Sequence, residues 1–597
     1  MKGMVNLNND QWDLTVIFKN EDELNSAKKE LQNGINKIKQ FEGKLVNSAE
    51  SIYYCYKTYE EILEIFDKIY AYSMLKYHQN MADTEGIKLF KEAEKIGADL
   101  SIVLSFIEPE LTKVPEDILK KYLVENVNLR RYERELKEII ENKKHVLSLE
   151  IEKILASFSE VFSLSENAFD IFTNTEFKFP EIIDENGKKI EITSANYSKY
   201  LSSNDKEVRK QAFYSMYSLY KKHINTITEL YLARVKEMNV KSKMRNNKSA
   251  LEAAVYADDA TIKVYESLVE VVDERLKVNH RYINLKKKLL NLDEFHLYDV
   301  YANPLKLQQK EVTYEEAKQT VLDALKPLGE EYQNMLKTAF EENWVDVYAK
   351  DNKRSGAYSL GVYGVHPFVL TNFIGEEEDI STLAHELGHS MHSYYSNKNQ
   401  NIIDSNYTIM VAEVASTVNE MILGYYLIEK EENPQKKAAL INSELDKIRA
   451  TLIRQTMFAE FEKIVHEKVG LGETLTSDEL CEIYLDLNKK YFGSNIIIDD
   501  EIKYEWARIP HFYSCFYVYK YATGISCAIA IAKKILSGEE GFVDKYINML
   551  KKGCTKKSVE LLRDVGVDLE TKQPYEDAFD FMNNYLDELE KLTDIQK

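Results

Sequence analysis

Apolar side chains recur at three- and four-residue steps through most of the chain, and this spacing predicts amphipathic helices. The first such stretch runs from about residue 21 to residue 144, and residues 151–162 resume the same period. Helical periodicity returns near residue 195 and continues to about residue 336. We therefore expect a mainly α-helical protein.

Two stretches depart from the helical period. Residues 177–193 alternate apolar and charged positions around Asn186-Gly187, a pair that favours a tight hairpin turn. Residues 355–373 are rich in glycine, aromatic and β-branched residues, which predicts an extended segment. Because Pro367 has no backbone N–H, we expect an edge strand there. These two stretches predict a β-hairpin around residue 187 and a small β-sheet that comes just before residues 382–392, where the candidate active site lies.

The composition is consistent with long helices around a large core. With 44% hydrophobic residues, the chain of 597 residues can bury enough apolar surface to fold. It contains only 9 Pro and 21 Gly, which favours long helices over many short strands. The net charge of −21 repels phosphate backbones and no basic run offsets it, so we expect no nucleic-acid partner.

Cysteine usage and hydropathy bear on the cellular compartment. The five cysteines show no C-x-x-C spacing, which favours neither a disulfide framework nor a thiolate metal site. The N-terminal residues lack the apolar core of a signal peptide. The most apolar stretch, residues 522–532, is about half as long as a membrane-spanning helix. We expect a cytoplasmic protein without a membrane partner, and the sequence leaves its oligomeric state open.

A metal-binding pattern lies at residues 382–392, which read TLAHELGHSMH. His385 and His389 are four residues apart, so both imidazoles project from one helical face and can bind one metal ion. Glu386 lies beside them and is placed to act as the general base of a zinc hydrolase. The chain has only 11 His, so a chance match to H-E-x-x-H is rare.

A zinc hydrolase usually takes three protein ligands and keeps one position for water. The metzincin extension of the motif fails, because Tyr395 stands where that motif has its third His. His392 shares the helical face, but it lies about 10 Å along the axis from His385, too far to bind the same ion. We expect His392 to be a packed side chain or a neighbour of a ligand.

The third ligand is expected from the next helical stretch. Residues 408–420 form a largely apolar stretch whose only acidic residues are Glu413 and Glu420, seven positions apart. A carboxylate in such a helix must be paired or bound to a metal. Glu413, whose small neighbours permit close helix approach, is our third ligand, and Glu420 is expected to hold a ligand histidine or a cation. Asp404, in the preceding polar loop, is the competing ligand.

Three ordered motifs carry a family resemblance: HELGHSMH at 385–392, VAEVAST at 411–417 and RIPHFYSCFYVYKYATG at 508–524. Together they resemble the thimet-type oligopeptidases, and within them oligoendopeptidase F. The segment Gln11-Trp12-Asp13-Leu14 is also similar to that group. The similarity extends over nearly the whole chain and is stronger in its catalytic part.

The resemblance implies a large two-part helical molecule, saddle-like or clam-like, that encloses a deep channel with zinc on its floor. Such a channel admits only short unfolded peptides. The resemblance also implies one Zn²⁺ ion per chain bound by His385, His389 and Glu413, with Glu386 as catalytic base. We divide the chain into an N-terminal helical domain that ends in the hairpin, 1–194, and a helical zinc peptidase domain, 195–597.

The third motif contains candidate transition-state donors. Tyr513, Tyr517 and Tyr521 recur every four residues and would form one hydroxyl-bearing stripe if helical, preceded by His511. An isolated stripe of this kind is more often aromatic core. Peptide hydrolysis, however, builds an oxyanion that needs donors besides the metal, and the resemblance places a His and Tyr cluster at that task. We expect His511, Tyr517 and Tyr521 to supply these donors, with the register among the tyrosines open.

Three further groups are candidates for substrate contacts. Residues 355–373 offer a backbone edge to an extended peptide. His366 lines that cleft or has a structural role, the two being equally expected. Arg508 could bind a peptide carboxylate, but we expect it to form a surface or structural ion pair within the protein instead.

These observations predict a zinc-dependent endopeptidase that hydrolyses internal bonds of short unfolded peptides. Water attacks directly, and Glu386 accepts its proton and passes it toward the leaving amine. One alternative is a zinc carboxypeptidase or other exopeptidase on the same scaffold, which needs a residue that captures a peptide terminus. Another alternative is a non-catalytic peptide-binding protein with a vestigial metal site. The complete set of candidate ligands and base argues against it, because a decayed site would be expected to have lost one of them.

Overall fold

The computed structural model describes residues 10–305 and 310–594. Helices take up 71% of the chain, so the prediction of a mainly α-helical protein is confirmed. The residues group into two compact units. Unit 1 comprises Met1–Lys144, Gln309–Leu423 and Ile531–Gly566, and unit 2 comprises His145–Gln308, Gly424–Ala530 and Val567–Lys597. This grouping by contact combines segments distant in sequence, whereas the sequential boundary at 194/195 stays a prediction.

The elements of unit 1 are α1 (Glu21–Ile38), α2 (Ala49–Gln79), α3 (Thr84–Leu104), α4 (Ile107–Leu111), α5 (Glu116–Glu125), α6 (Glu133–Asn142), α15 (Tyr314–Ala324), α16 (Gly329–Glu341), β3 (Val345–Tyr348), β4 (Tyr358–Leu360), β5 (Phe368–Phe373), α17 (Glu377–Asn399), α23 (Phe542–Leu550) and α24 (Ser558–Asp564). Two helices include residues of both units, α18 (Ile409–Lys430) and α22 (Tyr519–Leu536).

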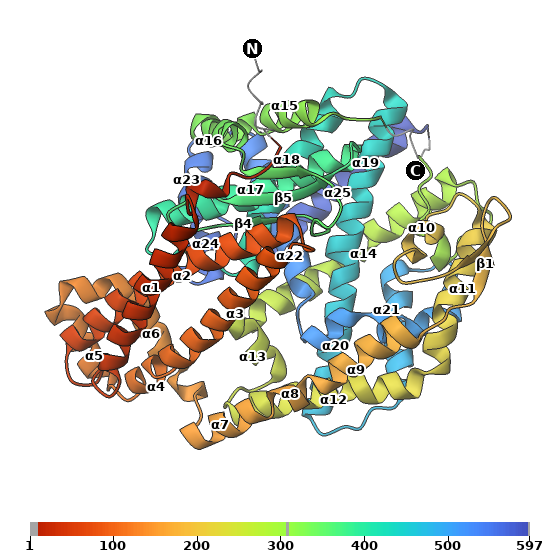
Figure 1. Cartoon of the computed structure of the whole chain (residues 1–597). Helices are drawn as coiled ribbons and strands as arrows, with labels where there is room; N and C mark the ends of the chain where they lie inside the picture. Colours follow the sequence, from red (N-terminus) through yellow and green to blue (C-terminus); the bar gives the residue numbers. More distant parts are fainter. Residues whose placement is uncertain (1–9, 306–309, 595–597) are drawn as a thin grey trace, which may run out of the picture. The chain divides into compact units, whose positions relative to one another are not determined.

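The elements of unit 2 are α7 (Leu149–Ser157), α8 (Ser159–Phe162), α9 (Leu164–Ile171), β1 (Glu181–Ile183), β2 (Lys189–Glu191), α10 (Tyr197–Leu201), α11 (Lys206–Lys222), α12 (Ile224–Met244), α13 (Ala250–Ala257), α14 (Ile262–Leu289), α19 (Pro434–Ile448), α20 (Arg454–Gly470), α21 (Ser477–Phe492), the 3-10 helices η9 (Asp500–Arg508) and η10 (Pro510–Ser514), and α25 (Gln573–Leu592). Figure 1 shows their order along the chain.

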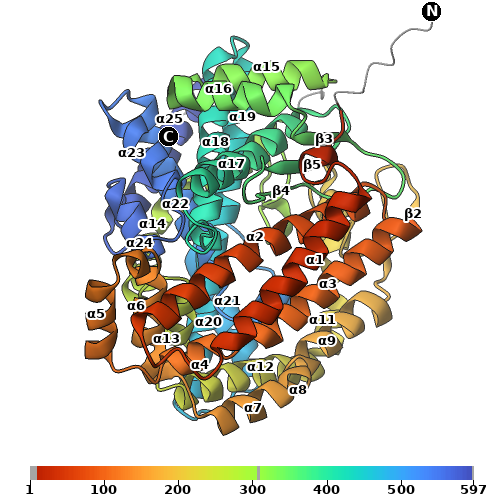
Figure 2. The ribbon, with the colours of Figure 1, turned by 60° about the vertical axis from the view of Figure 1, so that its left-hand side comes forward.

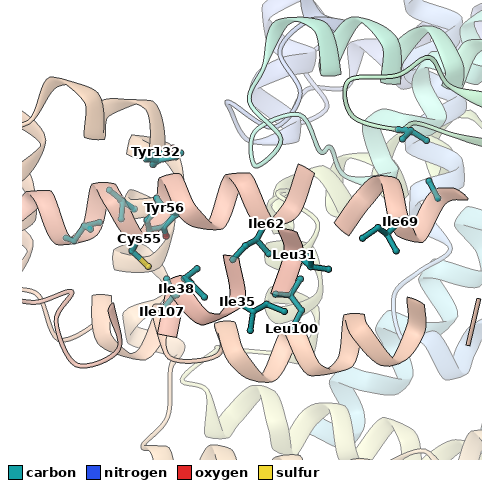
Figure 3. Close-up of a cluster of buried hydrophobic side chains, with 14 of the residues drawn as sticks. Leu31, Ile35, Ile38, Cys55, Tyr56, Ile62, Ile69, Leu100, Ile107 and Tyr132 are labelled. Atoms are coloured by element: carbon teal, nitrogen blue, oxygen red, sulfur yellow. The ribbon is translucent and has the colours of Figure 1, made fainter. Parts of the chain in front are cut away.

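The N-terminal helices of unit 1 form a layer in which α1, α2 and α3 lie side by side (Figure 2). Each contributes an apolar stripe to one buried cluster, in which Leu31 and Ile35 of α1 lie with Ile62 of α2 and Leu100 of α3 (Figure 3). Gly34 of α1 permits the close packing, because a Cβ there would lie 2.8 Å from Ile62. Burying a side chain of this size contributes about 1.5–3 kcal/mol, so this layer is held mainly by its apolar core.

A three-stranded sheet of unit 1 has the order β3-β5-β4, with β3 parallel and β4 antiparallel to β5. The expected edge strand at Pro367 is therefore wrong for β5, which is central, and the edge strand of this stretch is β4. Pro367 lies one residue before β5, so its missing N–H removes no hydrogen bond from the ladder.

Residues near the start of the described chain complete this sheet. The backbone N–H of Val347 in β3 donates to the carbonyl of Asp10 at 3.0 Å. The indole Nε1 of Trp12 donates to the carbonyls of Trp344 and Val369 at 3.0 and 2.8 Å. These bonds join the N-terminal segment to the sheet that precedes the candidate catalytic helix.

In unit 2, the predicted hairpin is confirmed as β1 paired antiparallel with β2. Gly187 has φ 76° at its turn, a conformation that glycine adopts without strain. The long helix α14 packs against α20, α21 and α25. No helix within residues 10–305 and 310–594 combines the length and the apolar character that a membrane crossing requires.

Candidate metal centre

The helix that carries the H-E-x-x-H pattern, α17, follows β5 directly and lies beside β4 and β5 (Figure 1). The carboxylate of Asp379 accepts the backbone N–H groups of Ile374, Gly375 and Glu376. The bond to Glu376 is part of a capping box, the other two hold the preceding residues against the first turn, and the acidic first turn complements the helix dipole. The expected helix is therefore present, and the sheet lies beside it as predicted.

His385, His389 and Glu413 bring three ligand atoms together. The Nε2 atoms of His385 and His389 are 3.2 Å apart, and Glu413 Oε2 is 3.9 Å from His385 Nε2. All three ligand atoms lie within 4.8 Å of one another. Zinc–ligand distances of about 2.0–2.1 Å in a tetrahedron place neighbouring ligand atoms about 3.3 Å apart. The donor set and its spacing therefore fit one zinc ion.

Both histidines are oriented by hydrogen bonds. His385 Nδ1 donates to Glu420 Oε1 at 2.6 Å, which leaves the Nε2 lone pair free for a metal. Glu420 thus holds His385, one of the two histidines predicted to bind the metal. Burial lowers the pKa of His385, but the bond to Glu420 and the nearby carboxylates outweigh it and raise that pKa. His389 is hydrogen-bonded to the backbone of Ala412, and burial lowers its pKa to about 4, which favours the neutral ligand form.

Glu386 is buried beside the ligands and differs from them in having an unsatisfied oxygen. Its Oε2 atom has no hydrogen-bond partner among the described residues. Burial raises the pKa of Glu386 to about 7, the negative charges of Glu413 and Glu420 add to the rise, and His385 opposes it. A buried carboxylate with a free oxygen and a pKa near neutrality is suited to accept a proton from water.

In unit 2 the structure brings together His511, Tyr517 and Tyr521. The ring centroids of His511 and Tyr517 are 6.2 Å apart, those of His511 and Tyr521 are 6.0 Å apart, and those of Tyr517 and Tyr521 are 5.5 Å apart. We call these three residues the His–Tyr cluster. Their catalytic roles stay predictions.

The condition for one helical tyrosine stripe is not met. Tyr513 lies in η10, residues 515–518 form no helix, and Tyr521 lies in α22. Tyr513 is instead buried and stacks on Phe169, with ring centroids 4.5 Å apart. The spacing of four thus groups Tyr517 with Tyr521 and leaves Tyr513 in the aromatic core.

Comparison with known proteins identifies the family. Residues 199–581 match the family described as Peptidase family M3, and residues 110–179 match the family described as Oligopeptidase F. The chain belongs to peptidase family M3. The resemblance to oligoendopeptidase F that the three motifs indicate is confirmed.

This M3 peptidase is 40% identical over 583 residues to Oligopeptidase PepF from Bacillus subtilis, a match that covers 98% of this chain and 87% of the relative. An Oligoendopeptidase F homolog from Lactococcus lactis is 36% identical and covers 98% of this chain and 97% of the relative. The crystal structure of oligoendopeptidase-F from Enterococcus faecium has 34% identity and a TM-score of 0.73, covering 96% of this chain and 100% of that one. These matches confirm the metalloendopeptidase class.

The sequence analysis did not single out Gly388 of the M3 peptidase, the glycine between the two candidate ligand histidines. A Cβ at Gly388 would lie 2.6 Å from Ser416 Cα and 2.8 Å from the Ala415 carbonyl oxygen. The two helices α17 and α18 therefore touch backbone to backbone, and this contact brings Glu413 to the histidines. The glycine in H-E-L-G-H could have indicated this contact, because a glycine inside a helix usually has a packing or functional reason.

Asn419 is the second residue missed. It is fully buried, its Nδ2 donates to the Ala384 carbonyl at 3.0 Å, and its Oδ1 accepts from the Tyr332 hydroxyl at 2.9 Å. It thus fixes α18 against the turn of α17 that precedes His385. A buried amide one position before Glu420 in an apolar helix is the signal that could have found it.

The other sequence candidates lie outside the ligand set. His392 is buried and stacks on Tyr407 with ring centroids 3.6 Å apart, as expected for a packed side chain. The carboxylate of Asp404 accepts from Asn401 Nδ2 at 2.7 Å.

Two further candidates for substrate contacts have structural partners. His366 stacks on Trp344 with ring centroids 5.1 Å apart, which is the structural role. Arg508 pairs with Glu505 at 3.7 Å and lies over the ring of Tyr197, so the preferred ion pair is confirmed.

Proposed function

We propose that this M3 peptidase is a zinc-dependent endopeptidase that hydrolyses internal bonds of short unfolded oligopeptides. The observation that carries the proposal is the convergence of two imidazole nitrogens and one carboxylate oxygen beside the unsatisfied carboxylate of Glu386. The names of the relatives, oligopeptidase and oligoendopeptidase, support peptides as the substrate class. The expected channel, cytoplasmic location and lack of nucleic-acid or membrane partners stay predictions.

His385, His389 and Glu413 hold the ion in this proposal, one per chain. When bound, zinc acts as a Lewis acid that polarises the scissile carbonyl and acidifies water. Glu386 orients the attacking water, accepts its proton and then delivers it to the leaving amine. Glu420 keeps His385 in the tautomer that binds through Nε2.

The His–Tyr cluster supplies hydrogen-bond donors to the oxyanion that forms during attack. Burial, aided by Arg454, lowers the pKa of His511, so its imidazole is neutral near pH 7 and carries one N–H donor. The hydroxyls of Tyr517 and Tyr521 are the other donors. Donors aimed at developing charge usually contribute the largest single share of transition-state stabilisation.

The outer edge of β4 is proposed to bind the extended substrate. Within the described residues, β4 pairs only with β5, so its other side has no strand partner. β4 lies directly on α17, because Ser359 Oγ and Ser390 Oγ are 2.8 Å apart and a Cβ on Gly361 would lie 2.6 Å from Ser393 Cβ. A peptide added at this edge gains backbone hydrogen bonds with little side-chain selectivity.

The test is cleavage of an internally quenched peptide of about ten residues with both ends blocked, a substrate without the free terminus that an exopeptidase needs. The zinc-loaded enzyme is compared with Glu386→Gln, with a chelator-treated sample restored by zinc, and with Glu378→Gln, an exposed carboxylate on the same helix. We expect the wild type and Glu378→Gln to cleave, and Glu386→Gln and the chelated sample to be inactive. Cleavage of unblocked peptides alone would instead establish an exopeptidase, and bound zinc without cleavage of either would indicate a binding protein.

A further inference from the structure

The turn that precedes Tyr517 contains a strained residue. Phe516 has φ 59°, in the left-handed region that glycine favours. For a residue with a Cβ this conformation is strained. It persists only where surrounding contacts determine it, so the groups around Phe516 show what holds this turn.

Two polar groups of unit 2 hold the turn from opposite ends. Glu462 of α20 accepts the backbone N–H of Phe516 at its Oε1, at 2.8 Å. Arg234 of α12 donates from Nε to the carbonyl of Tyr513 at 2.7 Å. The chain between Tyr513 and Phe516 is therefore fixed by a cation at its first carbonyl and a carboxyl group at its last N–H.

The side chain of Phe516 is fixed as well. It is 1% exposed, and its ring lies against His466, with centroids 4.5 Å apart, and edge-on to Tyr265 at 6.0 Å. With both its ring and its N–H held, the next residue leaves the turn in a defined direction. That residue is Tyr517 of the His–Tyr cluster.

We propose that Glu462 is a positioning residue for peptide hydrolysis, holding the left-handed turn at Phe516 so that the Tyr517 hydroxyl is presented with His511 and Tyr521. Glu462 does not touch the substrate and acts through Tyr517. This inference rests on the proposed function, because it assumes that the His–Tyr cluster serves the transition state.

The free-energy cost of burying the Glu462 carboxyl group supports a specific role for this residue. Its side chain is 0% exposed, and its Oε2 atom has no hydrogen-bond partner among the described residues. Burying a carboxyl group on a single backbone N–H is expensive, and an apolar side chain would fill this place at lower cost. Burial raises the pKa of Glu462 to about 8, so the neutral acid is the form present near pH 7.

The test compares Glu462→Gln, which keeps an oxygen for the Phe516 N–H, with Glu462→Leu, which removes it. We expect Glu462→Leu to lower kcat on the blocked peptide at least about tenfold with KM and zinc content unchanged, whereas Glu462→Gln stays within about twofold. Glu460→Leu is the matched control on the same helix, because Glu460 binds Lys490 and Tyr491 instead of the turn. The Glu460→Leu substitution should lower the Tm and leave kcat unchanged.

A double mutant separates positioning from general stability. If Glu462 acts through Tyr517, adding Glu462→Leu to Tyr517→Phe lowers kcat little further, whereas independent structural damage multiplies the two losses. Multiplied losses, or equal kcat in wild type and Glu462→Leu, would overturn the inference. If Glu462→Leu does not fold, Glu462→Asp replaces it, since the shorter side chain no longer reaches the Phe516 N–H and should lower kcat alike.

The same experiment distinguishes the two proposals. An unchanged kcat in Tyr517→Phe shows that the His–Tyr cluster does not serve the transition state, and the role of Glu462 fails with it. A reduced kcat in Tyr517→Phe with no effect of Glu462→Leu overturns only the positioning role.

Discussion

The metal centre and the His–Tyr cluster are built on different kinds of backbone. His385, His389 and Glu413 project from two regular helices in contact, so helical spacing alone relates the two histidines. Tyr517, by contrast, follows Phe516, a residue in the left-handed conformation, and lies between the 3-10 helix η10 and α22. Residues on regular helices are placed by their own segment, whereas residues on an irregular turn are placed by remote groups such as Glu462 and Arg234.

The largest expected effect is on the metal centre. Glu386→Gln removes the proton acceptor but no ligand, so kcat should fall by about 10²–10⁴ while one zinc ion stays bound. Stopped activity assays and zinc analysis by atomic emission measure the two quantities. Loss of zinc together with activity would show that Glu386 is structural instead.

Removing the hydroxyl of Tyr517 tests whether the His–Tyr cluster donates hydrogen bonds to the oxyanion. Tyr517→Phe should lower kcat by about 10²–10³ with KM unchanged, because an oxyanion donor acts in the transition state. The control is Tyr513→Phe, since the Tyr513 hydroxyl is buried without a hydrogen-bond partner among the described residues. Equal kcat values for the two variants would place Tyr517 in the aromatic core as well.

A smaller effect is expected from the residue that orients a ligand. Glu420→Gln weakens the bond to His385 Nδ1, so the zinc affinity should fall about 10–100-fold. Competition with a chromogenic chelator measures this change, and excess zinc should restore most of the activity. An unchanged affinity would mean that the helix packing alone orients His385.

A separate effect, on stability and not on catalysis, is expected from Glu462, whose pKa is raised by burial from 4.5 to about 8. Between these values the folded protein holds a proton that the unfolded chain has lost. Stability should therefore fall as the pH rises from about 5 to 8 and then level off. Glu462→Gln removes this slope, and urea unfolding at several pH values compares the two proteins.

The neighbours of Glu462 do not titrate in this range. The pKa of Cys515 is raised to about 12, and those of Tyr231 and Tyr265 lie well above their ordinary value, in each case chiefly by burial. Burial lowers the pKa of His466 to about 3. A slope that persists in Glu462→Gln would come from groups elsewhere in the protein.

Much of the metal centre could be predicted from the sequence, because its geometry is local. A spacing of four fixes the relation of His385 to His389, and a carboxylate in an apolar helix indicated Glu413. The sequence did not show which helix faces the glycine at 388, since periodicity describes one helix and not its neighbour. The same limit hid Asn419, whose partners Ala384 and Tyr332 lie far away in the chain.

The tertiary arrangement was less accessible. The tyrosine spacing indicated one stripe only if the segment were helical, and the strain at Phe516 that breaks the helix is imposed by contacts with α12 and α20. The position of β5 at the centre of its sheet depends on a partner strand, β3, that the pattern did not reveal. The two compact units combine distant segments, which no local periodicity encodes.

The backbone contact at Gly388 also joins two helices, α17 and α18, that follow one another directly in the chain. The candidate ligands, Glu386 and Glu420 all lie between positions 385 and 420, so this set is complete in the nascent chain before residue 511 has been translated. The candidate metal site and the His–Tyr cluster therefore depend on stretches of the chain that are synthesised one after the other.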